Sequence, residues 1–156
     1  RYGMRKMEAG KLKRESVDIQ KKVLRVWSFK NHEWREIPLM PEVADAFKEH
    51  YKHVAKSPWV FPMVTDPERH CSSQILDKGW YEARELAGIR GRLRFHDLRH
   101  TFATRTAEEN WPPILACEIL DMSLSVYQNT YCKGSLAKKD QLLRKTFAES
   151  YGKDSV

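Results

Sequence analysis

The feature that most constrains this fold is a change in hydrophobic period near residue 40. Between about residues 16 and 39, apolar and polar side chains alternate, as they do on strands that bury one face. Asn31-His32 interrupts this region as a polar turn, and Pro38 and Pro41 end it. From Pro41 onward, apolar residues recur at helical spacing. The pattern predicts an α+β fold: a mainly helical domain with a small three-stranded antiparallel sheet.

The sequence after residue 40 predicts a series of helices. Pro41 suits the first turn of a helix that ends near Ser57-Pro58, and Gly88 suits the end of a second helix that covers about residues 72–87. Other helices are expected at about residues 4–13, 96–109, 112–120, 123–131 and 136–150. No repeat, low-complexity segment or linker divides the 156 residues, so a single domain is expected.

Charge and cysteine content narrow the functional class. The formal charge is +7, and residues 1–40 hold 11 Lys and Arg against 5 Asp and Glu. A basic surface binds polyanions through counterion release, so nucleic acid is the first expected partner, ahead of an anionic membrane surface or a merely solvated face. No apolar run reaches the roughly 20 residues that a membrane helix needs. Three cysteines, an odd number, favour free thiols and a reducing, intracellular compartment.

The densest polar cluster is the segment around His96. On a helix, His96 and Arg99 share one face, while Leu98 and Phe102 are expected to face the core. A guanidinium offers a permanent fork to phosphate, and an imidazole can exchange a proton near neutral pH, although a plain surface pair has the same spacing. Zinc bound by His96 and His100 is a further alternative, which Arg99 between them disfavours because it repels a dication. No metal or cofactor is expected.

Four short motifs follow one another along the chain. They are the Gly-x-Arg-x-x-Glu segment from Gly3 to Glu8, Lys30 in a hairpin turn, the His-x-x-Arg box from His96 to Arg99, and Ile119-Leu120-Asp121-Met122 followed by Tyr131. In this order and spacing they resemble the catalytic domain of the tyrosine recombinases, the phage integrase family. The resemblance implies site-specific recombination or integration of phage or mobile-element DNA, with double-stranded DNA as the partner.

The resemblance implies a role for each residue of these motifs. Arg5 and Arg99 would bind the non-bridging oxygens of one phosphodiester and stabilise its transition state. Tyr131 would attack the phosphorus, assisted by His96, to give a 3′-phosphotyrosine and a free 5′-hydroxyl. Lys30, on a mobile hairpin tip, would protonate the leaving oxygen as general acid. The strands could then be rejoined without a metal or ATP.

Two assignments compete with simpler interpretations. Glu8 lies three residues after Arg5 and is expected to orient it, although an ordinary surface ion pair has the same spacing. Tyr127 lies one helical turn before Tyr131, and only the family register selects Tyr131 as the nucleophile.

One position departs from the family pattern. Where the family has Gly-His, often with Trp in place of the His, this chain has Asp121-Met122. His and Trp offer an N–H to a phosphate oxygen, whereas the Met122 thioether has no donor, and losing one such donor typically costs on the order of 10²–10³ in rate. A carboxylate at residue 121 would also repel phosphate, although Asp tolerates the left-handed backbone that often ends a helix. Reduced activity is expected.

The resemblance leaves alternatives for function and assembly. A DNA-binding relative that has lost catalysis and a type IB topoisomerase-like enzyme would share many of these motifs. The chain is expected to be a fragment, residues 1–156 forming the catalytic domain without the family's N-terminal core-binding domain. The segment 134–156 is expected to pack on its own domain or on a neighbouring protomer of a tetramer on DNA. A cytoplasmic, DNA-associated protein encoded by a bacterium or phage is implied.

Overall fold

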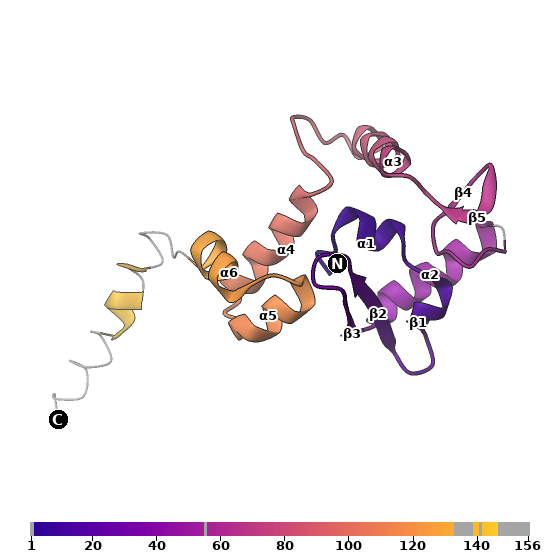
Figure 1. The fold of residues 1–156 in the computed structure, drawn as a ribbon. Coiled ribbons are helices and arrows are strands. Elements are labelled where there is room, and N and C mark those ends of the chain that lie inside the picture. Colours follow the sequence, from indigo (N-terminus) through magenta and orange to yellow (C-terminus); the bar gives the residue numbers. More distant parts are fainter. Residues whose placement is uncertain (1, 55, 133–138, 141, 147–156) are drawn as a thin grey trace, which may run out of the picture.

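The structure is a computed structural model that describes residues 2–54, 56–132, 139–140 and 142–146. A small antiparallel sheet precedes a series of helices along the chain, which confirms the predicted α+β class (Figure 1). The helix predicted at 136–150 falls partly outside the described residues, of which 139–140 and 142–146 are helical. Within the part of the chain that the structure describes, no helix is long and apolar enough to span a membrane.

The predicted sheet is present and has the expected topology. Strands β1 (Val17–Asp18), β2 (Val23–Ser28) and β3 (Glu33–Pro38) pair antiparallel in the order β1-β2-β3. Alternate residues of β2 and β3 point inward, where Leu24, Val26 and Ile37 are almost completely buried. Ser28 pairs with Glu33 at the end of the ladder, so residues 29–32 form a turn beyond the sheet.

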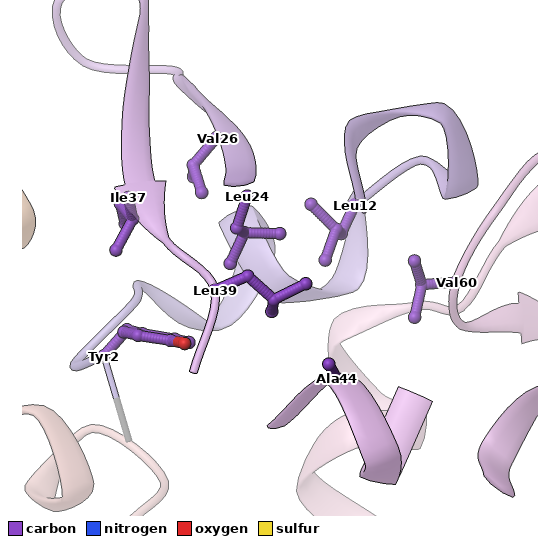
Figure 2. Close-up of a cluster of buried hydrophobic side chains, with 8 residues drawn as sticks. All are labelled: Tyr2, Leu12, Leu24, Val26, Ile37, Leu39, Ala44 and Val60. Carbon is purple, nitrogen blue, oxygen red and sulfur yellow. The ribbon is translucent and has the colours of Figure 1, made fainter. Parts of the chain in front are cut away.

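The first hydrophobic core lies between this sheet and helix α2 (Pro41–His53) (Figure 2). Its buried side chains come from the sheet, the N-terminal segment, α2 and the stretch before β4. They are Tyr2, Leu12, Leu24, Val26, Ile37, Leu39, Ala44 and Val60. The removal of these apolar surfaces from water is what binds the sheet to the rest of the chain.

The N-terminal helix is shorter than predicted. Helix α1 covers Lys6–Gly10 instead of residues 4–13. The next residues are extended, because Leu12 accepts a backbone hydrogen bond from Val60 and Arg14 donates one to Pro58. A short 3₁₀ helix, η1 (Arg14–Ser16), then leads into β1.

A second core holds three C-terminal helices together. Helices α4 (Asp97–Glu108), α5 (Pro113–Leu120) and α6 (Leu124–Tyr131) lie within a residue or two of their predicted positions. Their buried cluster consists of Ala103, Ala116, Leu120 and Tyr127. Met122 and Tyr131 pack against its edge.

The middle of the chain departs most from expectation. The β-hairpin formed by β4 (Pro62–Met63) and β5 (Asp66–His70) was not predicted, and helix α3 (Ser73–Leu86) confirms the predicted helix but buries none of its residues. Leu86 is 92% exposed, and Leu98, expected to face the core, is 46% exposed. The helical core is filled by residues from Phe102 onward, so the first turn of α4 lies outside it.

Candidate active site

Arg5 and Glu8 form the first part of the site. Arg5 is the residue before α1, and its backbone N–H donates to Glu8 Oε2 at 2.8 Å while Nη1 donates to Glu8 Oε1 at 2.8 Å. This confirms the predicted contact. Glu8 is buried at 3% exposure, so it is not an ordinary surface ion pair. It also accepts from Arg35 Nη2 at 2.8 Å, which joins β3 to the N-terminal segment.

Asp121 closes the ionic cluster from the opposite end of the chain. It ends α5 in the left-handed conformation (φ 51°), as expected for Asp at such a position. Arg5 donates to its carboxylate through Nη1 and to its backbone carbonyl through Nη2. Burial opposes the charge on Asp121, but hydrogen bonds from Ser28 and Arg5 outweigh it and lower the pKa of this carboxyl. Asp121 is therefore ionised at neutral pH.

Arg99 brings the second guanidinium to the same place. It lies on α4, is 4% exposed, and donates from Nη1 to the Gly3 carbonyl at 2.8 Å. Burial lowers the pKa of Arg99, and repulsion from the nearby Arg5 lowers it further. Because the two guanidinium charges repel each other, an anion bound between them would be stabilised.

Gly3 makes this approach possible. Its φ is +60°, and a Cβ there would lie 2.7 Å from Leu120 Cδ2 and 2.9 Å from Phe102 Cδ1. Only a residue without a side chain lets the N-terminal segment pass this close to α4 and α5.

Tyr131 ends α6 with its hydroxyl against a histidine. The Tyr131 Oη is 2.6 Å from His100 Nδ1, whereas the sequence pointed to His96 as its partner. His96 lies beside His100 with its ring centroid 4.9 Å away. Burial lowers the pKa of His96, and the nearby charges of His100 and Arg99 add to this effect. Burial raises the pKa of Tyr131, and Arg99 partly opposes that shift.

Tyr127 is separated from the site by its burial. Its side chain is fully buried, and its hydroxyl lies 2.9 Å from Thr106 Oγ1. Thr106 donates its own hydroxyl proton to Ala103 O at 2.8 Å, so Tyr127 is the donor to Thr106. Tyr127 is thus part of the helical core, and Tyr131 is the tyrosine near Arg99.

Lys30 and Met122 line a hollow of about 500 Å³ beside this cluster. Lys30 lies on the exposed turn between β2 and β3, as predicted. Its neighbour Asn31 donates from Nδ2 to Asp121 Oδ1 at 2.6 Å, which connects the turn to the ionic cluster. Among the described residues, no group of three or more His, Cys, Asp and Glu is placed to hold a metal.

Sequence reasoning missed several residues of this arrangement. Arg35 occupies the same face of β3 as buried Ile37, and a charged residue on a buried strand face is a signal that could have identified it. His100 entered the sequence analysis only as an alternative metal ligand. Ser28 and Asn31 had no signal of their own, because both serve Asp121, which lies on a distant element.

Comparisons with known proteins agree on one family. The model of the phage integrase family matches residues 1–133. A prophage integrase of Mycobacterium tuberculosis, named phiRv2 integrase, is 41% identical over 76 residues, which are 47% of this chain and 20% of that protein. An integrase/recombinase of Sinorhizobium fredii is 27% identical over 107 residues, 68% of this chain and 34% of that protein.

Solved structures show the same fold at lower identity. The XerA recombinase superposes with a TM-score of 0.74 at 21% identity, covering 93% of this chain and 52% of that one. The XerH recombinase bound to its difH DNA superposes with a TM-score of 0.72 at 22% identity, covering 91% of this chain and 42% of that one. The chain thus spans a fifth to a third of the curated relatives and about half of the solved ones.

Proposed function

The chain belongs to the phage integrase family, and from this we propose that it cleaves and rejoins DNA strands in site-specific recombination. The observation that carries the proposal is the position of the Arg99 guanidinium, which lies near both Arg5 and Tyr131, while the Tyr131 hydroxyl contacts the His100 imidazole. Arg5 already has two carboxylate partners, whereas Arg99 donates to the neutral Gly3 carbonyl, so a phosphodiester of DNA would supply an anion for Arg99. Relatives in the family have been solved on DNA, XerH on difH among them.

The proposed chemistry is a transesterification at phosphorus. Tyr131 Oη forms the new bond to phosphorus, its proton passes to His100 Nδ1, and the bond from phosphorus to the 5′ oxygen breaks. Lys30 gives the leaving 5′ oxygen its proton. Arg5 and Arg99 stabilise the charge that gathers on the non-bridging oxygens. The products are a 3′-phosphotyrosine and a 5′-hydroxyl, and the reverse step rejoins the strands.

His96 has a different role in this proposal from the one that the sequence indicated. Its lowered pKa leaves the imidazole neutral at pH 7, and it lies beside His100 on the N-terminal end of α4. We assign it as a hydrogen-bond donor to a phosphate oxygen, while His100 takes the phenolic proton. Glu8 positions Arg5 through its two hydrogen bonds.

A nicked DNA duplex that traps the covalent intermediate tests the proposal. The wild-type chain is expected to form a protein–DNA adduct that resists denaturation, and Tyr131→Phe to form none while binding the same DNA equally well. Tyr127→Phe is the matched control, because it removes the other phenolic hydroxyl of α6 and leaves the nucleophile. Absence of an adduct with both the wild-type chain and Met122→His, with DNA binding intact, would refute the enzymatic function.

Double-stranded DNA is the proposed partner, and assembly on it stays a prediction. The family match supports recombination over the type IB topoisomerase alternative. The predicted tetramer would form through residues 134–156, and this segment lies largely outside the described residues. Analytical ultracentrifugation of the chain with and without 134–156 would test it.

A further inference from the structure

We propose that Asp121 is a positioning residue that ties the turn carrying Lys30 to Arg5. The general acid and one phosphate-binding arginine would then be in a fixed relation before DNA arrives. The catalytic part of this inference rests on the proposed function, whereas its structural part does not.

The turn between β2 and β3 is closed by a backbone hydrogen bond from His32 to Ser28 at 2.9 Å and is connected to the rest of the domain through Asp121. The ladder ends at the Ser28–Glu33 pair, and Lys30 and Asn31 are exposed beyond it. Asn31 Nδ2 donates to Asp121 Oδ1 at 2.6 Å. Ser28 Oγ donates to Asp121 Oδ2 at 2.7 Å and accepts from the Asn31 backbone N–H at 3.0 Å. Asp121 therefore binds the side chain of Asn31, the residue after Lys30. It also binds the Ser28 hydroxyl, which in turn accepts from the backbone N–H of Asn31.

The same carboxylate holds Arg5. Arg5 Nη1 donates to Asp121 Oδ2, the oxygen that also accepts from Ser28, and Nη2 donates to the Asp121 carbonyl. One carboxylate is thus shared between the turn and the arginine. Ser28 and Asp121 are buried, so an arrangement that breaks the hydrogen bonds between them leaves a buried polar group unpaired.

The negative charge of Asp121 is neutralised by cations inside the protein. Its side chain is 5% exposed, and Arg35, itself 12% exposed at the side chain, lies 3.9 Å from the carboxylate. Arg35 also donates from Nε to the Ile119 carbonyl at 3.2 Å, which fixes the end of α5. The two cations Arg5 and Arg35 balance the two anions Glu8 and Asp121, so the negative charge of Asp121 is neutralised within the cluster. This arrangement argues against Asp121 acting mainly as a repelling anion.

The structural arm of the test uses backbone ¹⁵N relaxation on the whole chain. Asp121→Asn and Asp121→Gly both tolerate the left-handed backbone, so the fold is expected to remain. In both variants we expect the order parameters of residues 30–32 to fall from about 0.85 to below about 0.6, with those of β2 and β3 unchanged. Glu85→Gln is the control, since it removes one negative charge from an exposed side chain on α3 that does not line the hollow.

The catalytic arm uses DNA in which sulfur replaces the 5′ oxygen that leaves. A thiolate leaves without protonation, so this substrate rescues a defect in the general acid alone. We expect Asp121→Asn to cleave ordinary DNA at least about tenfold more slowly than the wild type and to recover on the sulfur substrate, as Lys30→Ala does. Arg5→Ala is expected to stay defective on both, and Glu85→Gln to match the wild type on both.

The two arms separate the possible failures. Unchanged order parameters at residues 30–32 in both variants would overturn the tether, whether or not the chain cleaves DNA. Faster cleavage of ordinary DNA by Asp121→Asn would make Asp121 a repelling anion and overturn the inference. A defect that persists on the sulfur substrate would place the effect on Arg5 and overturn it as well. A wild-type chain that attacks neither substrate would refute the proposed function, while the relaxation data would still decide the tether.

Discussion

At the scale of single residues, burial distinguishes side chains that look alike in the sequence. Tyr127 and Tyr131 lie one turn apart on α6, yet Tyr127 is sealed in the helical core and Tyr131 meets His100. Hydrogen bonding makes the difference: a phenol that donates to Thr106 inside the core cannot reach a substrate. The packing thus leaves Tyr131 beside an imidazole, and its role as the nucleophile stays a prediction.

Met122 offers the sharpest prediction at this scale. Its thioether lines the hollow with Lys30 and supplies no hydrogen-bond donor. Met122→His is expected to raise the rate of adduct formation, by up to the 10²–10³ typical of one transition-state donor. Single-turnover trapping on nicked DNA measures this rate. Met122→Leu, which is similar in size and has no donor, is the control, and an equal rate for Met122→His would contradict the prediction.

At the scale of elements, the N-terminal segment depends on a close approach rather than on helix propensity. Gly3 passes between Phe102 of α4 and Leu120 of α5, and its carbonyl accepts from Arg99. The short helix α1 begins only after this contact, where Glu8 accepts the Arg5 backbone N–H. The placement of Arg5 is therefore set by α4 and α5.

Gly3→Ala tests this dependence. The added Cβ would meet two side chains below 3.0 Å at a positive φ, so we expect a loss of about 1–3 kcal/mol in the free energy of unfolding. Urea denaturation measures it. Gly79→Ala on α3 is the control, because nothing lies within 4 Å of the new Cβ and a helical Gly→Ala change is expected to stabilise by about 0.5–1 kcal/mol. Equal effects of both changes would show that the approach is not tight.

At the scale of the whole molecule, the ionic cluster connects two hydrophobic cores. Arg35 comes from the sheet, Asp121 from the end of α5, and Arg5 from the N-terminal segment between them. The cluster has its full effect only while its carboxylates are ionised, so acid should loosen the joint between the cores.

Acid unfolding measures this coupling. The pKa of Asp121 in the folded chain lies below its ordinary value of 3.8, so its contribution to stability is fully present above that pH and is lost as the pH falls through the folded-state pKa. We expect the difference in unfolding free energy between the wild type and Asp121→Asn to shrink as the pH drops below 3.8. The lowered pKa values of Asp97 and Glu49 are common to both proteins and cancel in the comparison. A difference that does not vary with pH would contradict this expectation.

By itself the sequence determined the α+β class, the order of the first three strands and of the helices, and the short-range pair of Arg5 and Glu8. Periodicity reports which face of an element is buried, and helical spacing brings residues three or four apart together. The exposure of Leu86 and Leu98 escaped this reasoning, because an apolar residue on a helix is buried only if another element covers it.

Only the tertiary structure decided which residues meet at the site. Arg5 and Asp121 are 116 residues apart, and Arg99 and Gly3 are 96 apart, so no local pattern encodes either contact. His100 faces Tyr131 because of how α4 packs on α6, so the imidazole that contacts the tyrosine lies one helical turn after His96. In the sequence, Asp121 departs from the family motif and was expected to repel phosphate. In the fold, its carboxylate is a shared hydrogen-bond acceptor, because donors from Arg5, Ser28 and Asn31 converge on it.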